Sequence, residues 1–185
     1  MTENKFEVAV LAGGCFWCTE AIFQRLEGVD EVISGYTGGT MKNPSYNDIG
    51  TGQTGHAEVI KITYDPQSIG YKELLDIFFA THDPTSLNRQ GDDQGTQYRS
   101  AIFYTNKEQK KIAEQVIDEL TNKNIFEDVI VTEVTELDVF YNAENYHQDY
   151  YNQNSKQSYC EFVINPKLNK LSIIFEDKIK KENLK

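Results

Sequence analysis

A chain of 185 residues with 39% hydrophobic residues is long enough to bury a substantial core, and we expect one catalytic domain over residues 1–185. The net charge of −11 argues against binding to nucleic acid or to anionic membranes, because both need basic surfaces. Residues 1–7 lack a basic segment followed by an apolar one, and no apolar run reaches the roughly 18 residues of a membrane span. Three cysteines are too few for a disulfide scaffold and suit a reducing compartment. We therefore expect an unexported, cytoplasmic protein, by default a monomer.

Hydrophobic periodicity predicts alternating strands and helices over the first three quarters of the chain. In chain order the expected elements are a strand over 8–11, a helix over 15–26 ended by Gly28, a strand over 29–36, a strand over 56–64, a helix over 68–81, a strand over 100–104, a helix opened by a Thr105–Glu108 capping box, and a strand over 129–134. The order β-α-β-β-α-β is that of a split βαβ unit. It predicts an α/β (α+β) fold with a ferredoxin-like sandwich core, an added helix, an added strand and a C-terminal extension.

The last quarter of the chain is less regular. From about residue 140 the sequence is rich in Tyr, Asn and Gln, and we expect irregular structure there. The tyrosines of residues 141–159 could form a peptide-binding surface, but a packing layer is the interpretation we favour. Apolar residues at helix spacing predict an amphipathic helix from about residue 167, over 168–179, that packs on the body.

Two cysteines and the only tryptophan fall within residues 14–18, where a predicted strand passes into a helix. Cys15 should lie at the helix N-terminus, where free amide groups and the helix dipole stabilise a thiolate. Cys15 and Cys18 could form a reversible disulfide, although two small buried hydrophobic residues are the alternative. We expect no metal site, because no further cysteine pair or histidine pair supplies the missing ligands.

The strand over residues 56–64 contains a candidate proton donor. Alternation along the strand places Glu58 on its more apolar face, where desolvation would raise the pKa of the carboxyl group. A carboxylate in water at the edge of the sheet is the alternative. Asp93 lies in a charged loop before Tyr98 and is a weak signal by itself. The three histidines, His56, His82 and His147, are interpreted as structural or solvent-facing rather than catalytic.

Five short segments together carry a resemblance to a known family. They are Gly14-Cys15-Phe16-Trp17, Ser34-Gly35-Tyr36-Thr37-Gly38-Gly39, Thr54-Gly55-His56-Ala57-Glu58, Gly95-Thr96-Gln97-Tyr98-Arg99-Ser100 and Tyr146-His147-Gln148. From residue 13 to about residue 167 the chain resembles the A-type peptide-methionine sulfoxide reductases. The resemblance implies a repair oxidoreductase that reduces the S epimer of methionine sulfoxide, both protein-bound and free. It also implies oxidised proteins as substrates, no bound cofactor, and thioredoxin or dithiothreitol as the external reductant.

The resemblance also assigns roles to residues of the candidate site. Cys15 would attack the sulfoxide sulfur, and Glu58 would protonate the sulfoxide oxygen. Phe16 and Trp17 would form the walls around the substrate methyl group. The residues expected on the polar side of the site are Tyr36 and Tyr98, which would hydrogen-bond the oxygen, and Asp93, which would orient that side.

A second thiol must condense with the sulfenic acid that forms on Cys15. Many family members have glycine at the position of Cys18 and carry resolving cysteines in a glycine-rich tail. Here Cys160 matches the first tail position, but the apolar residues 161–164 that follow predict a rigid β-like segment. Cys18 is close in sequence but must leave the first helical turn to reach Cys15. We favour Cys18 slightly as the resolving thiol and keep Cys160 open.

Two other functions fit parts of the same pattern. A cysteine pair beside a βαβ unit is typical of a thioredoxin-like dithiol oxidoreductase. The tyrosines of the C-terminal quarter would suit a non-catalytic module that binds methionine-containing peptides. A bulky Phe16-Trp17 pair between the cysteines and a proton donor on a separate strand argue against the first alternative.

Overall fold

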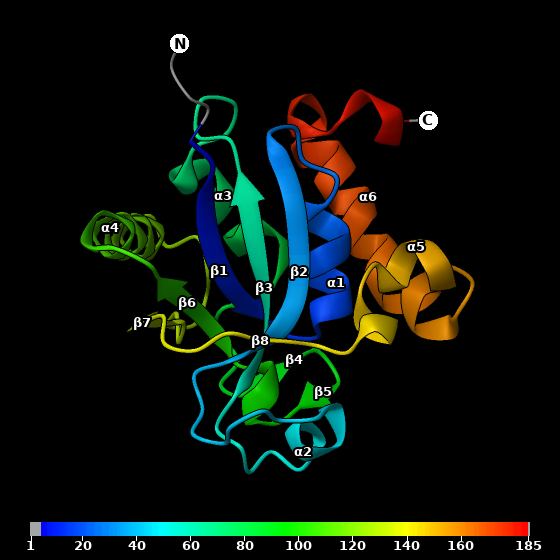
Figure 1. Ribbon diagram of the computed structural model, residues 1–185. Helices are drawn as coiled ribbons and strands as arrows, with labels where there is room; N and C mark the ends of the chain where they lie inside the picture. The colour runs from blue at the N-terminus through cyan, green and yellow to red at the C-terminus, as the bar shows by residue number, and fades with distance from the viewer. Residues whose placement is uncertain (1–4, 185) are drawn as a thin grey trace.

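The computed structural model describes residues 5–184, which form a six-stranded sheet flanked by helices (Figure 1). Its strands, in chain order, are β1 (Glu7–Gly13), β2 (Val29–Thr37), β3 (Ala57–Tyr64), β6 (Ser100–Tyr104), β7 (Glu133–Glu136) and β8 (Tyr141–Asn142). The strand order is β7-β6-β1-β3-β2-β8; the inner strands β6, β1, β3 and β2 are antiparallel to one another, and β7 pairs parallel with β6. This is the order of a split βαβ sandwich, so the expected fold class is confirmed. Residues 1–4, part of the start on which the expectation of an unexported protein depends, lie outside the described residues.

The helices and short turns connect these strands. The α-helices are α1 (Phe16–Phe23), α2 (Tyr46–Gly50), α3 (Tyr71–Thr81), α4 (Lys107–Asn122), α5 (Tyr150–Asn154) and α6 (Asn165–Ile174). The remaining elements are a hairpin of β4 (Arg89–Gln90) and β5 (Asp93–Gln94), a π-helix at Cys160–Ile164, and 3-10 turns at Thr96–Tyr98, Asn145–His147, Glu176–Lys178 and Lys181–Asn183. Helices α1, α3 and α6 lie behind the sheet in Figure 1, and α4 lies beside β6. None of these helices is long and apolar enough to cross a membrane.

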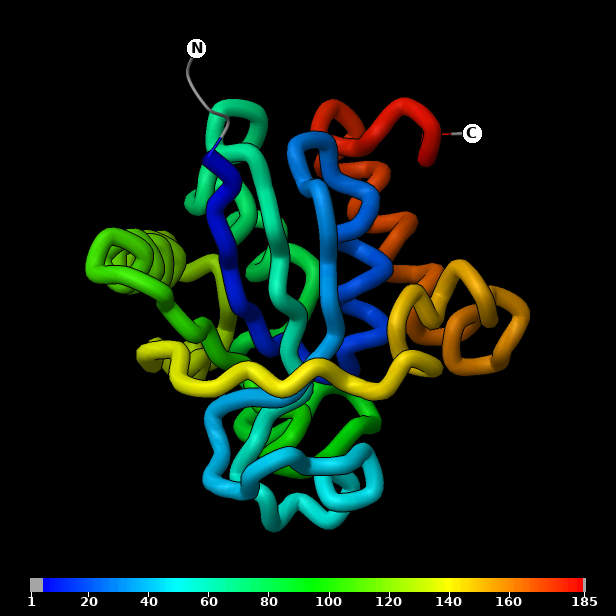
Figure 2. The backbone as a smooth tube through the Cα atoms, in the orientation of Figure 1, coloured from blue at the N-terminus to red at the C-terminus, as the bar shows by residue number. Residues whose placement is uncertain are grey.

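The core follows from the alternation of side chains along β1 and β3. Leu11, Ile60 and Ile62 are fully buried on the face that α1 and α3 cover. The opposite face is apolar too, and the segment before β8 crosses it (Figure 2). There Phe140 packs so close to Gly35 of β2 that a Cβ atom on this glycine would lie 2.3 Å from the ring. Glycine is therefore required at this position of the strand.

Four predicted boundaries in the first three quarters of the chain are wrong. The helix expected over 68–81 begins only at Tyr71, with Gly70 as its N-cap. Helix α1 ends at Phe23, and Gly28, with φ of +88°, forms the turn into β2 instead of capping the helix. The N-cap of α4 is Asn106 rather than Thr105, because its side chain accepts the backbone N–H of Gln109 at 2.9 Å. The strand expected over 129–134 begins only at Glu133.

Two predictions for the C-terminal quarter also need correction. The helix expected over 168–179 spans Asn165–Ile174 instead. It begins earlier than expected because proline is well tolerated in a first helical turn, so Pro166 does not delay its start. The segment 161–164, expected to be β-like, is part of the π-helix. Its side chains follow helical spacing, with Cys160 and Ile164 buried and Phe162 exposed. Short apolar runs fit a strand and a helix equally well, which explains the error.

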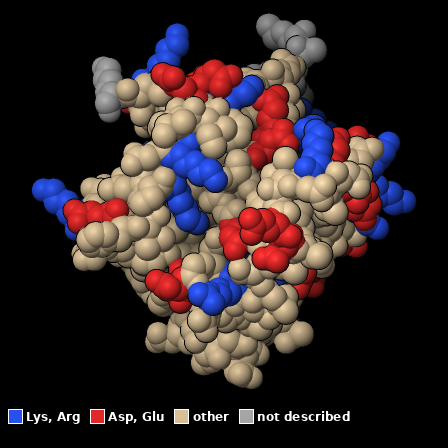
Figure 3. Space-filling view, turned by 180° about the vertical axis from the view of Figure 1, so that it is seen from behind, with Lys and Arg blue, Asp and Glu red and all other residues tan. Residues whose placement is uncertain are grey.

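Charged side chains are spread over the surface. Figure 3 shows acidic and basic residues interspersed on the rear face of the molecule. The lowest part of that face, formed by the loop that contains α2, carries few charges. The loops between the strands gather at this end of the sheet, directly below the end of β1 (Figure 1).

Candidate active site

Cys15 lies where β1 passes into α1, at the loop end of the sheet (Figure 1). It is the N-cap residue of α1, as its position in the sequence predicts. Gly14 before it has φ of +94°, and a Cβ atom there would lie 2.6 Å from the side chain of Gln90. Glycine thus permits both the sharp turn and the close approach of the β4–β5 hairpin to the cysteine.

The thiols of Cys15 and Cys18 are buried in one cluster, and the backbone N–H of Cys18 donates to Cys15 O at 3.1 Å. Burial raises the pKa of the Cys15 thiol well above its usual value, and the neighbouring Cys18 thiol and the charge of Glu58 raise it further. Interaction with the Cys15 thiol lowers the pKa of Cys18 to about 7. Desolvation of Cys15 thus opposes the stabilisation of a thiolate that its place at the helix N-terminus predicts.

Glu58 lies on the apolar face of β3 and is only 2% exposed. Its Oε1 accepts the backbone N–H of Phe16 at 3.2 Å, which places the carboxyl group one residue from Cys15. Desolvation raises the pKa of Glu58 to about 8, although the Phe16 bond opposes the rise. At neutral pH this carboxyl group is mostly protonated, so the desolvated alternative of the sequence analysis is the correct one.

The two aromatic residues of the cysteine motif, Phe16 and Trp17, pack against different tyrosines. Phe16 is buried against Tyr36, with the ring centroids 5.7 Å apart. Trp17 is half-buried, stacks on Tyr150 with the centroids 3.7 Å apart, and meets the edge of Tyr159 at 5.8 Å. The two tyrosines therefore pack against the motif, as expected of a packing layer.

The polar residues expected near the cysteine differ in their partners. Tyr36 lies directly opposite Glu58 in the β2–β3 pairing, but its hydroxyl donates to Glu144 at 3.1 Å. Tyr98 is half-buried and packs in the cluster that contains both motif cysteines. Asp93 accepts a hydrogen bond from the Tyr159 hydroxyl at 2.7 Å, and the same hydroxyl lies 3.5 Å from Cys18 Sγ.

An open pocket of about 340 Å³ leads to the two sulfurs. Its walls come from the motif, the β4–β5 hairpin and the C-terminal segment. The residues that line it are Cys15, Cys18, Gln90, Gly91, Asp92, Asp93, Tyr159, Phe162, Val163, Pro166 and Lys167. Phe16, Trp17, Glu58, Tyr36 and Tyr98 are not among them, so they lie around the cysteines rather than along the pocket.

The comparisons with known proteins agree on one family. The family model described as "Peptide methionine sulfoxide reductase" matches residues 7–179. The chain belongs to this family. The protein "Peptide methionine sulfoxide reductase MsrA" of Deinococcus radiodurans is 53% identical over 174 residues, which cover 94% of this chain and 84% of that protein. The chain is accordingly an oxidoreductase enzyme that reduces methionine sulfoxide.

Solved structures of the methionine sulfoxide reductase family have the same fold. The structure of Mxr1 from Saccharomyces cerevisiae in reduced form has a TM-score of 0.77 at 35% identity, covering 84% of this chain and 90% of that one. A structure of Mxr1 in complex with Trx2 has a TM-score of 0.54 at 26% identity, covering 79% and 85% of the two chains.

Four residues of this methionine sulfoxide reductase contact the candidate site without having been predicted there. Glu144, Tyr150 and Tyr159 contact it as described, and His147 accepts a hydrogen bond from the Trp17 indole. All four lie in the Tyr/Asn-rich segment, about 130 residues from the cysteine motif. Local hydrophobic periodicity does not predict contacts over such a distance in sequence. The segment Tyr146-His147-Gln148, which carries part of the family resemblance, is the one signal that could have identified His147.

The third cysteine of the reductase is also near the motif. Cys160 is fully buried in one cluster with Cys15 and Cys18. No group of three or more His, Cys, Asp or Glu side chains among residues 5–184 could hold a metal ion.

Proposed function

We propose that the chain reduces the S epimer of methionine sulfoxide with Cys15 as the nucleophile and Glu58 as the proton donor. The observation that carries the proposal is the buried carboxyl group of Glu58, held by the Phe16 amide beside Cys15. A sulfoxide oxygen leaves poorly until it is protonated, so a buried acid near neutral pH supplies what the reaction needs.

The first step transfers oxygen from the substrate to the enzyme. Cys15 Sγ attacks the sulfoxide sulfur, Glu58 protonates the oxygen, and the proton of Cys15 passes to the Cys18 thiolate. Methionine leaves, reduced by two electrons, and Cys15, oxidised by two electrons, carries the sulfenic acid. The low pKa of Cys18, about 7, makes it a suitable acceptor for that proton.

The surrounding groups would select the epimer. Phe16 and Trp17 form the wall for the substrate methyl group, and the oxygen faces Glu58 with Tyr98, Tyr36 and Asp93 on the polar side. When the methyl group, the oxygen and the attacking sulfur each have a fixed place, only one epimer directs the rest of the methionine chain outward. The choice of the S epimer itself is taken from the family resemblance.

The second step forms a disulfide between Cys15 and Cys18. The Cys18 thiol attacks the sulfenic sulfur, and the sulfenic oxygen leaves as water with the Cys18 proton. Cys18 lies in the same helical turn as Cys15, with its backbone N–H bonded to Cys15 O at 3.1 Å, which favours it over Cys160. Reduction of the disulfide returns two thiols, and a proton that moves from Cys18 to Glu58 restores the resting site.

The external reductant in this proposal is thioredoxin, with dithiothreitol as its laboratory substitute, and no cofactor is bound. The yeast relative has been solved in complex with Trx2, which supports a thioredoxin partner. The open pocket gives a reductant access to the Cys15–Cys18 bond. Oxidised proteins and free methionine sulfoxide are the substrates, and the enzyme works in the cytoplasm as a single catalytic domain and a monomer.

The test combines turnover with disulfide mapping. Wild-type protein should convert an S-sulfoxide dipeptide to its methionine form with dithiothreitol, and Cys15→Ser should abolish this reaction. One equivalent of substrate without reductant should give a Cys15–Cys18 disulfide in peptide mass mapping, also in Cys160→Ser. Activity in Cys15→Ser, or preference for the R epimer, contradicts the proposal. A Cys15–Cys160 bond would transfer the resolving role to Cys160.

A further inference from the structure

The three histidines of the chain differ in how their ring nitrogens are satisfied. His56 and His82 are buried, and both nitrogens of each ring have hydrogen-bond partners. His147 is fully buried as well, but only its Nδ1 is bonded. Within the part of the chain that the structure describes, its Nε2 has no partner. A histidine kept for packing alone would be expected to satisfy both nitrogens, as the other two do, so the unpaired nitrogen needs an explanation.

The bonded nitrogen of His147 holds the indole of Trp17. Trp17 Nε1 donates to His147 Nδ1 at 3.1 Å, across 130 positions of sequence. Because Nδ1 accepts this bond, the imidazole is neutral and carries its proton on Nε2. Burial lowers the pKa of His147, which keeps Nδ1 available as an acceptor at neutral pH. The Nε2–H group of His147 is therefore buried without a partner, while Nδ1 serves as the acceptor for the Trp17 indole.

The other contacts of Trp17 do not fix the direction of its N–H group. Tyr150 stacks on the indole with an angle of 6° between the ring planes, and Tyr159 meets it edge-on at 80°. Stacking restrains the plane of the ring, but a flip of 180° about the Cβ–Cγ bond leaves that plane unchanged. A hydrogen bond is directional and distinguishes the two orientations. His147 also contacts Phe16, with the ring centroids 5.1 Å apart, so it touches both members of the aromatic pair.

We infer that His147 is a positioning residue that selects the orientation of the Trp17 indole in the substrate site. The inference rests on the proposed function, in which Trp17 and Phe16 form the wall for the substrate methyl group. His147 acts through these side chains and takes no part in proton transfer. Loss of its hydrogen bond should therefore weaken substrate binding more than the chemical step.

The experiment uses Trp17 as its own reporter, because it is the only tryptophan of the chain. His147→Phe removes the acceptor and keeps a planar ring, whereas His147→Gln offers an amide oxygen in its place. We expect His147→Phe to shift the Trp17 emission and to raise KM for an S-sulfoxide dipeptide about 3- to 10-fold, since a neutral hydrogen bond is worth this much. The kcat value and the rate of Cys15 alkylation by iodoacetamide should stay within twofold. His147→Gln should restore both the emission and KM.

The matched control is His82→Phe, which removes a buried histidine that does not contact Trp17. It should lower Tm but leave the emission and KM unchanged. Unchanged emission in His147→Phe, or a His147→Gln variant as impaired as His147→Phe, would overturn the inference.

A second measurement on the wild-type protein applies if His147→Phe does not fold. ¹⁵N-labelled protein should give one indole N–H signal that exchanges slowly with water, and exchange at the rate of free indole would overturn the inference. If Trp17 does not contact the substrate methyl group, so that the proposed function fails at this point, Trp17→Ala will leave KM unchanged. The slow exchange of the indole N–H in the wild type would still show its hydrogen bond to His147, so the two failures are distinguishable.

Discussion

At the scale of single residues, Glu58 is the group whose protonation should control the rate. Its pKa of about 8 means that the proton donor is present below this pH and is lost as the pH rises through it. We expect kcat/KM for the sulfoxide to fall about tenfold per pH unit above roughly pH 8. Glu58→Gln, which can still accept the Phe16 N–H group but cannot donate a proton, should lose about 10²- to 10⁴-fold in kcat/KM. Steady-state rates between pH 6 and 10 test both statements, and a flat wild-type profile together with an active Gln variant would contradict them.

Glu20 is a second buried carboxyl group, and the proposed chemistry does not use it. It is 1% exposed, accepts the backbone N–H of Tyr150 at 3.2 Å, and receives the hydroxyl of Ser34 at 3.2 Å. Burial raises its pKa from 4.5 to about 7. The folded state therefore keeps the proton up to about pH 7, whereas an unfolded chain releases it near 4.5. Stability from this group is fully present below pH 4.5 and is lost as the pH rises to 7.

Glu20→Gln should accordingly stabilise the protein at alkaline pH only. The rise of the pKa from 4.5 to about 7 corresponds to roughly 3 kcal/mol, which is the upper limit of the gain in unfolding free energy at pH 8. Below pH 4.5 the variant and the wild type should be equally stable. Urea denaturation at both pH values measures the difference. An equal gain at both values would show that the carboxyl group does not titrate as stated.

Single residues also show what the sequence could reveal about the site. Cys15 and Glu58 could be predicted, because a strand-helix junction and the alternation of one strand are local patterns. Tyr150 could not, since its contact with Trp17 spans about 130 positions of sequence, and His147 is indicated only by the Tyr146-His147-Gln148 segment of the family resemblance. The burial of Cys15 was also beyond the sequence, because the extent of burial is set by the whole fold.

At the scale of elements, the π-helix at Cys160–Ile164 forms one wall of the pocket that leads to the cysteines. Phe162 on this element is 78% exposed, an unusual place for a phenylalanine at the mouth of a catalytic pocket. π-Helical segments are often found at functional sites. A protein reductant that reaches the sulfurs must contact Phe162 at the mouth of the pocket, whereas a small thiol need not.

We therefore expect Phe162→Ser to raise KM for thioredoxin about 10-fold or more, since burial of a phenylalanine contributes about 1.5–3 kcal/mol. Turnover with dithiothreitol should stay within twofold. Ile173→Ser on α6 is the matched control, because Ile173 is 83% exposed and does not line the pocket. Steady-state kinetics with each reductant decide the matter. Equal effects of the two substitutions on KM for thioredoxin would exclude a role of Phe162 in binding the reductant.

The elements themselves were predictable to different degrees. The four inner strands follow from short apolar, β-rich runs bounded by turn residues, and the order β-α-β-β-α-β then gives their arrangement as β6-β1-β3-β2. The π-helix and the start of α6 were wrong because a short apolar run such as 161–164 has no decisive period. The added strand β7 was misplaced because its position depends on parallel pairing with β6, not on its own side chains.

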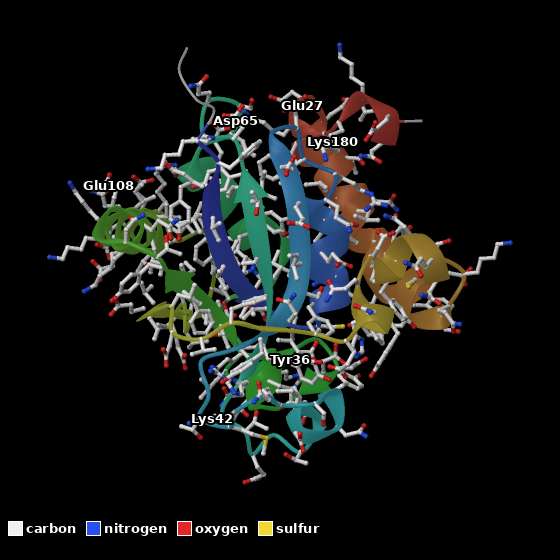
Figure 4. All side chains as sticks on the ribbon, in the orientation of Figure 1. Glu27, Tyr36, Lys42, Asp65, Glu108 and Lys180 are labelled. Carbon is white, nitrogen blue, oxygen red and sulfur yellow. The ribbon has the colours of Figure 1, made fainter. Side chains whose placement is uncertain are left out.

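At the scale of the whole molecule, the two ends of the sheet differ in role: one contains the proposed catalytic residues, and the other holds the C-terminal segment against the body. The loop end contains Cys15 and Tyr36, and the other end contains Glu27 and Lys180 (Figure 4). At that other end the C-terminal segment is tied to the end of α1: Glu27 N–H donates to Lys178 O at 2.7 Å, and Lys180 N–H donates to Arg25 O at 2.8 Å. Figure 4 shows Glu27 and Lys180 close together, far from Tyr36. Stability at this end should therefore be separable from catalysis at the loop end.

Ile179 tests this separation, because it is 5% exposed and forms a bridge with Leu26 in the same tie. Ile179→Ala should lower the unfolding free energy by about 2–4 kcal/mol, which is the usual cost of an emptied core position. For a chain of 185 residues this corresponds to a fall in Tm of about 5–12 °C. Because the cysteines lie at the opposite end of the sheet, kcat/KM of the folded variant should stay within twofold. Calorimetry and steady-state kinetics on the same preparation, with the exposed Ile173→Ala as control, measure both. A folded Ile179→Ala that loses activity in step with Tm would mean that the two ends are coupled through α1, which runs between them.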